Sequence, residues 1–345
     1  MRLTLDDLSA QTRRHGTPTP GARKLFSIMR DEMALLPSFL AHYRALGIEQ
    51  FLIFDDGSSD GTRETLAAQP DVVLYEARHR FGKPVEIVFP DDTSRKDRFG
   101  TWVKAALPHV EAPGEIVAYF DADEFLILPP GVTSLAEVFD TMTRGAIPAI
   151  CASVVEFFPE TLAGLDGAMP DTPKGLFAAY PFFEPEPLVT LIEGERPDPF
   201  GTSKTNKLFE EYGIDAAKPT FLQRLTGRKP KPRFKRSPRH KLPLLRRDAE
   251  TWQVGSHYAN RPPSADHLLT IAHFVFTAEF AAKIARARRW KAHTEGAAKY
   301  DHYDQLLGRM RAEGGRFTGP ASTRYTDPQQ LIDVGLMRWP GAQPG

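Results

Sequence analysis

Two aspartates separated by one residue, Asp121 and Asp123, are the residues of this chain best suited to do chemistry. In an extended chain, residues two apart point to the same side, so these carboxylates would lie together. Unpaired, they would repel and raise each other's pKa. A hard divalent cation, Mg²⁺ or Mn²⁺, that bridges to phosphate oxygens removes this repulsion and suits oxygen ligands. The alternative is a solvated acidic turn, which is common in loops.

The residues around this pair favour a site at the end of a strand. An apolar run, residues 116–120, precedes the pair, and a second apolar run follows Glu124 and is closed by Pro129 and Pro130. A short apolar run bounded by breakers is typical of a buried strand in a largely parallel sheet. Ligands of open α/β sheets bind just outside the carboxyl ends of such strands. We therefore expect the two aspartates to face a crevice.

Upstream of this pair, apolar runs and helical patterns alternate. The expected strands are 25–29, 50–55 and 72–76, and the expected helices between them are 33–46 and 63–68. Strands and helices that alternate at this short spacing favour a parallel sheet with right-handed crossovers. We therefore predict an α/β protein whose mostly parallel central sheet is flanked by helices, with further strands and a helix toward the C-terminus.

The first two of these strands end in polar turns. Arg30, Asp31 and Glu32 follow the first strand, and an Asp-Asp-Gly-Ser turn that begins at Asp55 and Asp56 follows the second. When such a turn leads into a helix, its amides and the helix N-terminus face a common ligand, as in nucleotide sites. The turn signal by itself is unspecific.

The composition excludes several classes of protein. The chain has 345 residues, with 44 Lys and Arg against 44 Asp and Glu, so its net charge suggests no nucleic-acid partner. The single cysteine, Cys151, excludes an intrachain disulfide and a Cys-based zinc site. Residues 1–24 lack the apolar core of a signal peptide, and we read them as a mobile arm. No run reaches the ~18 apolar residues of a membrane helix, so we expect a cytoplasmic protein.

Residues 224–247 form a basic block without Asp or Glu. We expect a loop that captures a diphosphate or an anionic acceptor, or that touches anionic lipid at the inner face of a membrane. A solvated basic loop is the alternative. Within the block, Lys241 and Arg246 lie on a strand-like stretch and are the residues that we expect to reach a diphosphate.

Several motifs, taken in chain order, resemble one family. They are Arg30-Asp-Glu32, the helix that ends at Gly47, the turn at 54–62, Asp121-Ala-Asp-Glu-Phe-Leu126, and the later blocks 241–246, 255–257 and 272–276. The ordered set is similar to the family-2-type glycosyltransferases of the GT-A fold, in particular a small subgroup with an Asp-Ala-Asp-Glu-Phe-Leu strand end. The resemblance spans residues 25–290, and residues 291–345 follow as a helix and a Pro/Gly-rich tail. Residues 159–215 match nothing in that family.

The resemblance implies a nucleotide-diphospho-sugar donor, a hydroxyl acceptor such as a cell-surface glycan, and Mn²⁺ or Mg²⁺ as cofactor. Asp55 and Asp56 would then contact the base and ribose, and Arg30 and Glu32 would line the nucleotide pocket.

The resemblance also implies a metal-binding set. Asp123 would ligate the metal, with Asp121 on the ribose or sharing the metal. A late histidine often adds a ligand in these enzymes, and His257 and His273 are both candidates.

Enzymes of this family generally invert the anomeric configuration of the transferred sugar. An inverting transfer needs a base that takes the proton of the acceptor hydroxyl. This chain has no convincing equivalent of the family's downstream acidic pair, so the base stays open among four residues. These candidates are Glu156, Glu184, Glu210 and Glu211.

Two other functions stay open. A sugar-phosphate nucleotidylyltransferase shares the sheet, but it would begin with a Gly-rich phosphate loop, and residues 25–32 contain no glycine. A catalytically silent glycan- or nucleotide-binding module is the non-enzyme alternative, which the intact Asp-Ala-Asp disfavours. P-loop and Rossmann enzymes are excluded, since neither glycine fingerprint is present.

Overall fold

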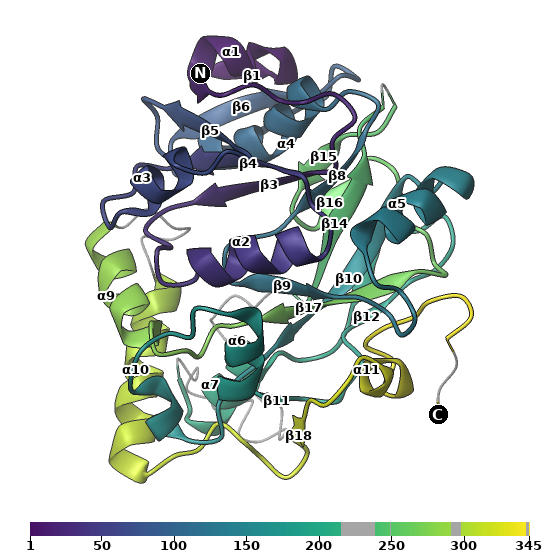
Figure 1. The fold of residues 1–345 in the computed structure, drawn as a ribbon. Helices are drawn as coiled ribbons and strands as arrows, with labels where there is room; N and C mark the ends of the chain where they lie inside the picture. Colours follow the sequence, from purple (N-terminus) through teal and green to yellow (C-terminus); the bar gives the residue numbers. More distant parts are fainter. Residues whose placement is uncertain (215–238, 249, 291–297, 343–344) are drawn as a thin grey trace, which may run out of the picture.

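A nine-stranded mixed sheet forms the centre of the protein, with helices on both of its faces (Figure 1). The computed structural model describes residues 1–214, 239–248, 250–290, 298–342 and 345. The strand order across the sheet is β2-β5-β4-β3-β8-β14-β10-β17-β9. The chain is therefore an α/β protein.

Half of the sheet is parallel and follows the predicted alternation of strands and helices. Its strands are β3 (Lys24–Met29), β4 (Gln50–Asp55), β5 (Val72–Ala77) and β8 (Ile116–Tyr119). The intervening helices are α2 (Leu36–Ala45), α3 (Thr62–Ala67) and α4 (Phe99–Glu111). The three predicted strands and two predicted helices upstream of the aspartates are thus confirmed to within a few residues.

The other half of the sheet is mixed, which corrects the prediction of a mostly parallel sheet. Its strands are β9 (Glu124–Ile127), β10 (Ala149–Glu156), β14 (His240–Arg246) and β17 (Leu268–His273), and β2 (Thr12–His15) lies at the opposite edge. β14 runs antiparallel to both of its neighbours, and β9 and β2 are antiparallel edge strands. An apolar run shows that a strand is buried on both faces but carries no information about the direction of its neighbours.

Strand β4 shows how the sequence builds the two faces. All six of its residues are buried. Phe51 and Ile53 point into the cluster that contains α2, and Leu52 and Phe54 point into the cluster that contains α4. Side chains alternate between faces along a strand, so a continuous apolar run lets one strand contribute to both cores.

The N-terminal residues pack onto the sheet, whereas we expected residues 1–24 to form a mobile arm. They form β1 (Arg2–Thr4), a 3-10 helix (Leu5–Asp7), α1 (Leu8–Gln11) and β2. Leu3, Leu5 and Leu8 are buried, and the Trp102 indole donates a 2.7 Å hydrogen bond to the Thr4 carbonyl. Strand β1 pairs with β6 (Pro84–Val88), which forms a hairpin with β7 (Ser94–Arg98).

The C-terminal part forms a helical extension beside the sheet. Helices α7 (Lys204–Glu211), α9 (Phe280–Trp290) and α10 (Ala298–Glu313) share one hydrophobic cluster, and α9 and α10 lie side by side (Figure 1). The remaining helices are α5 (Leu135–Arg144), a 3-10 helix (Leu162–Leu165), α6 (Pro173–Ala179) and α11 (Gln329–Asp333). The short strands are β11 (Phe182–Phe183), β12 (Val189–Thr190), β13 (Asp198–Pro199), β15 (Gln253–Gly255), β16 (Tyr258–Ala259) and β18 (Thr323–Arg324). Within the described residues, no helix is long and apolar enough to cross a membrane.

A tyrosine of α2 fixes the strand that follows the acidic pair. The buried Tyr43 hydroxyl donates a 2.8 Å hydrogen bond to the Glu124 carbonyl and accepts a 3.2 Å hydrogen bond from the Leu126 amide. Because β9 lies at the edge of the sheet, these backbone groups depend on a side chain for their partner.

Replacing Tyr43 by Phe should therefore destabilise the fold by about 1–3 kcal/mol, because a buried amide and a buried carbonyl lose their partner. Urea unfolding measures this change. Tyr258→Phe, at an exposed ring, is the matched control and should change the free energy of unfolding by less than about 0.5 kcal/mol. Equal stability of the two variants would contradict the role given to the Tyr43 hydroxyl.

Candidate functional site

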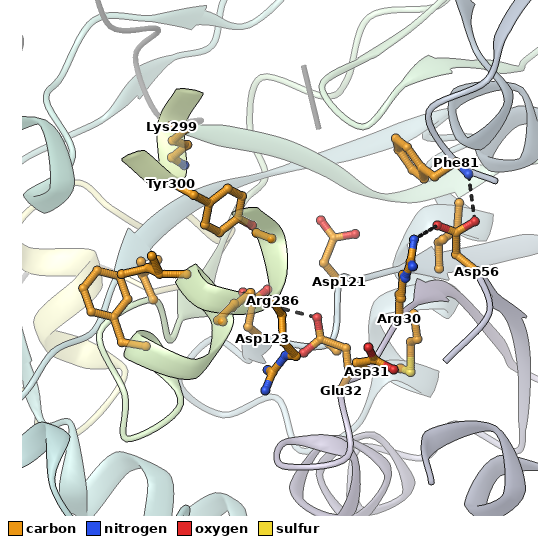
Figure 2. Close-up of a pocket in the computed structure, with 18 of the residues that line it drawn as sticks. Arg30, Asp31, Glu32, Asp56, Phe81, Asp121, Asp123, Arg286, Lys299 and Tyr300 are labelled. Atoms are coloured by element: carbon orange, nitrogen blue, oxygen red, sulfur yellow. Dashed lines mark hydrogen bonds and ion pairs between the residues drawn. The ribbon is translucent and has the colours of Figure 1, made fainter. Parts of the chain in front are cut away.

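A cavity of about 400 Å³ opens at the carboxyl ends of β3, β4 and β8. Residues that follow these strands line one side, and residues of α9 and α10 line the other. In Figure 2, Lys299 and Tyr300 stand on one side, Asp56 and Phe81 on the other, and Asp121 lies between them. The volume is in the range of small-molecule sites, which is about 300–1,000 Å³.

Asp121 is surrounded by a tyrosine and two lysines. The Tyr119 hydroxyl donates to its carboxylate, and Lys241 Nζ lies 3.0 Å from Oδ2. Lys241 is 2% exposed and also donates to Glu124, so it lies buried between two carboxylates. Lys104 Nζ lies 3.7 Å from Asp121 Oδ1. These cations hold the pKa of Asp121 below its usual value against the opposing effect of burial. Its carboxylate is thus ionised and positioned, while its side chain stays 40% exposed to the cavity.

Asp123 faces a lysine and a histidine. Lys283 Nζ lies 2.6 Å from Oδ2, and His273 Nε2 lies 3.6 Å from the same oxygen. Lys283 and, when protonated, His273 hold the pKa of Asp123 well below its usual value despite burial, and Asp123 in turn raises the pKa of His273. The register explains the contact, because His273 pairs with Glu124 across β17 and β9.

These residues fit a divalent cation as a partial ligand set. With ligand bonds of about 2.1 Å, two atoms can share one ion when they lie less than about 4.2 Å apart, and Asp123 Oδ2 and His273 Nε2 do. No group of three or more Asp, Glu, His or Cys side chains gathers around one point in the described part of the chain. Magnesium sites often use one or two carboxylates together with substrate phosphates and water, so two protein ligands suffice.

Glu32 is a further carboxylate of the cavity. Its Oε1 lies 3.8 Å from Lys283 Nζ. Burial, which outweighs the attraction of Lys283, raises the pKa of Glu32 to about 7. Glu32 therefore changes its charge near neutral pH, while the cations around Asp121 and Asp123 keep those residues ionised.

The opposite side of the cavity carries Asp56, Arg30 and Phe81. The Phe81 amide donates a 2.7 Å hydrogen bond to Asp56 Oδ1, and Arg30 Nη1 lies 3.7 Å from Oδ2 (Figure 2). Burial raises the pKa of Asp56. The Phe81 ring lies against α4 at Gly100, where an added Cβ would come within 1.9 Å of the ring. A carboxylate beside an aromatic ring is suited to a nucleoside base.

Asp55 lies outside the cavity lining. Its carboxylate accepts hydrogen bonds from the amides of Gly57, at 2.9 Å, and Ser58, at 3.1 Å. It therefore shapes the turn that presents Asp56, and a contact between Asp55 and a ligand stays a prediction.

Of the two late histidines, the structure brings His273 to the cavity. His257 lies beyond β14, where its Nδ1 is 2.8 Å from the His240 carbonyl, and burial lowers the pKa of His257 to about 4.

The two predicted diphosphate contacts, Lys241 and Arg246, lie at opposite ends of β14. Lys241 reaches Asp121, but Arg246 pairs with Ile116 at the opposite end of β8 and contacts the Met142 carbonyl. They lie five positions apart along the strand, which is about 17 Å.

The four candidate bases also lie outside the cavity lining. Glu156 is buried and accepts hydrogen bonds from the amide and hydroxyl of Thr205, at 2.5 and 2.8 Å, so it binds the N-terminus of α7. Glu184 accepts from Lys204, Lys207 and Ser322, which together lower its pKa. Glu210 and Glu211 are exposed at the end of α7.

Sequence reasoning missed Lys104, Lys283 and Phe81. Lys104 lies in α4, Lys283 lies in α9, and Phe81 lies in the turn before β6. A basic residue on the polar face of a helix that follows a site strand is a signal that could have identified Lys283. Residues 224–238 of the basic block lie outside the described residues, and only its end, with β14, can be placed.

Glu32 gives the fold a pH dependence. The pKa of Glu32 is about 7 in the folded protein and near 4.5 in the unfolded chain, so the folded state binds the proton of Glu32 more tightly. The stability that comes from this proton is complete below about pH 4.5 and is lost as the pH rises through 7. Glu32→Gln removes this titration. The free energy of unfolding of the variant, compared with that of wild type, should therefore increase by about 2–3 kcal/mol when the pH is raised from 5 to 8. Urea unfolding at both pH values measures this. A stability difference that stays constant with pH would rule out the raised pKa.

Comparison with known proteins adds no relative whose activity could be carried over. The chain matches no model in a scan against protein families and no protein in a search of curated ones. Function must therefore be inferred from the residues that converge on the cavity.

Proposed function

We propose that this protein is a metal-dependent glycosyltransferase of the GT-A type, which moves a sugar from a nucleotide-diphospho-sugar to a hydroxyl acceptor. Arg30, Glu32, Asp56, Asp121 and Asp123 are separated in sequence by up to 93 positions, and all line one cavity. This convergence, at the ends of parallel strands, is the observation that supports the proposal.

The two sides of the cavity suit the two parts of such a donor. Asp56 and Phe81 offer hydrogen-bond acceptors and a ring face for a nucleoside. Asp121 and Asp123 lie at the centre, where a ribose and a diphosphate would follow. The far side, with Tyr300, is left for the acceptor.

The charges of the cavity suit the departure of a nucleoside diphosphate. Negative charge builds on the leaving phosphate in the transition state, and cations that are already in place stabilise it. Lys104, Lys283 and Arg286 line the cavity and could supply such contacts. A divalent ion held by Asp123 and His273 would add Lewis-acid stabilisation of the phosphate oxygens when bound.

The proton of the acceptor hydroxyl needs a base, and Glu32, which is not among the four residues considered from the sequence, is a further candidate. Glu156 and Glu184 are engaged by α7 and by lysines, respectively. Glu32 lines the cavity and titrates near neutral pH, which suits general base catalysis. We therefore rank Glu32 above both as the base.

Thermal unfolding with a panel of nucleoside diphosphates and nucleotide sugars, with and without Mn²⁺, tests the proposal. A bound ligand at about 100 times its Kd stabilises the fold by about 2.7 kcal/mol. We expect such stabilisation for one class of nucleotide with Mn²⁺, and sugar release that Asp123→Ala abolishes. Stabilisation without turnover would indicate a binding module, and wild-type turnover in Asp123→Ala would overturn the metal assignment.

The nucleoside side is tested separately from the metal. Asp56→Asn should weaken binding of the selected nucleoside diphosphate about tenfold or more, with and without Mn²⁺, because it removes a charge-assisted acceptor. Asp91→Asn, in the exposed β6–β7 turn, is the matched control and should leave affinity unchanged. Isothermal titration calorimetry measures both. Weakening confined to the Mn²⁺ titration would move Asp56 from the nucleoside to the metal.

A further inference from the structure

Lys283 lies on the oxygen that the proposed metal would use. Its Nζ is 2.6 Å from Asp123 Oδ2, the same atom that lies 3.6 Å from His273 Nε2. A divalent ion and an ammonium group cannot both contact this oxygen closely, because their positive charges repel. The two cations therefore compete for Asp123.

The helix that carries Lys283 is anchored, so its side chain is the part that can move. Phe280 and Ala287, about one turn on either side, and the adjacent Ile284 are buried. From this fixed backbone a lysine side chain reaches out on a flexible four-carbon stem. Glu32 Oε1 is 3.8 Å from Nζ, so a second carboxylate is already within a small movement of the ammonium group.

The acidic groups explain why a cation is needed before any metal arrives. Glu32, Asp121 and Asp123 line one cavity. Asp121 has Lys241 and Lys104 beside it, whereas Asp123 has Lys283 and a histidine. Without Lys283, Asp123 and Glu32 would add negative charge to a partly dehydrated site, which is costly.

We propose that Lys283 is an exchangeable counter-cation of Asp123. It neutralises Asp123 when no metal is bound, and it moves off Oδ2 toward Glu32 when a divalent cation takes that position. This inference rests on the metal site of the proposed function and names the residue that opposes metal binding there. Its consequence is that the chain alone holds a divalent ion weakly.

The test measures Mn²⁺ binding in the absence of nucleotide, by calorimetry and by the Mn²⁺ electron paramagnetic resonance signal. Lys283→Met should bind Mn²⁺ at least tenfold more tightly than wild type, a difference of about 1.4 kcal/mol. Lys299→Met removes a lysine that lines the same cavity but lies over the Tyr303 ring, and it should tighten binding less than threefold. This variant controls for the general loss of one positive charge.

Additional variants separate the possible failures. Misfolding would weaken binding, so a gain in affinity cannot arise from it, and Lys283→Gln provides a second neutral side chain. Asp123→Asn combined with Lys283→Met should lose the gain. If Lys283→Met and Lys283→Gln bind no more tightly than wild type while Asp123→Asn abolishes binding, the metal site stands and the role of Lys283 is overturned. If no variant binds Mn²⁺ even with pyrophosphate present, the metal site and this inference both fail.

Discussion

The balance of charge around Asp121, Asp123 and Glu124 is the constraint on which the rest of this structure depends. Taking a carboxylate out of water costs several kcal/mol unless a cation compensates for it. Here the compensating lysines come from three distant parts of the chain: Lys104 from α4, Lys241 from β14 and Lys283 from α9. The acidic pair therefore fixes where these three elements must lie, beyond what their apolar faces require.

Helix α9 shows how one element serves both needs. Its apolar face, with Phe280 and Ile284, packs with α7 and α10 in one cluster, while Lys283 and Arg286 line the cavity. Its sequence alone also fits an amphipathic helix on a membrane surface. In the structure, protein covers the apolar face, and three basic residues of the helix reach carboxylates. Lys283 contacts Asp123, Arg286 contacts Glu279, and Arg288 contacts Asp301 and Asp304.

The sequence predicts best where a pattern is local. β4 begins and ends at the predicted residues because its six consecutive residues are buried and a turn follows at once. His273 lines the cavity because it ends β17, a strand formed by a continuous apolar run. The prediction that Arg246 reaches a diphosphate at the cavity is not supported, because the register of β14 against β8 places this residue at the far end of the strand. Register depends on contacts between strands, which a local pattern does not show. The prediction of a mobile N-terminal arm is wrong for a related reason. Leu3, Leu5 and Leu8 pack against α4 and against strands that follow much later in the chain.

The carboxylates of the chain show why a catalytic role cannot be read from residue type. Glu156, on an apolar strand, has the sequence context of a buried functional acid, yet the amide and hydroxyl of Thr205 occupy its oxygens, so it contributes to the fold. Glu32 lies in an ordinary charged turn, yet burial at the cavity raises its pKa to about 7. The difference comes from what surrounds each carboxylate: the groups of Thr205 occupy the oxygens of Glu156, whereas Glu32 is desolvated at the cavity. Those surroundings are assembled from elements far apart in the chain, so the candidate base could be ranked only once the fold was known.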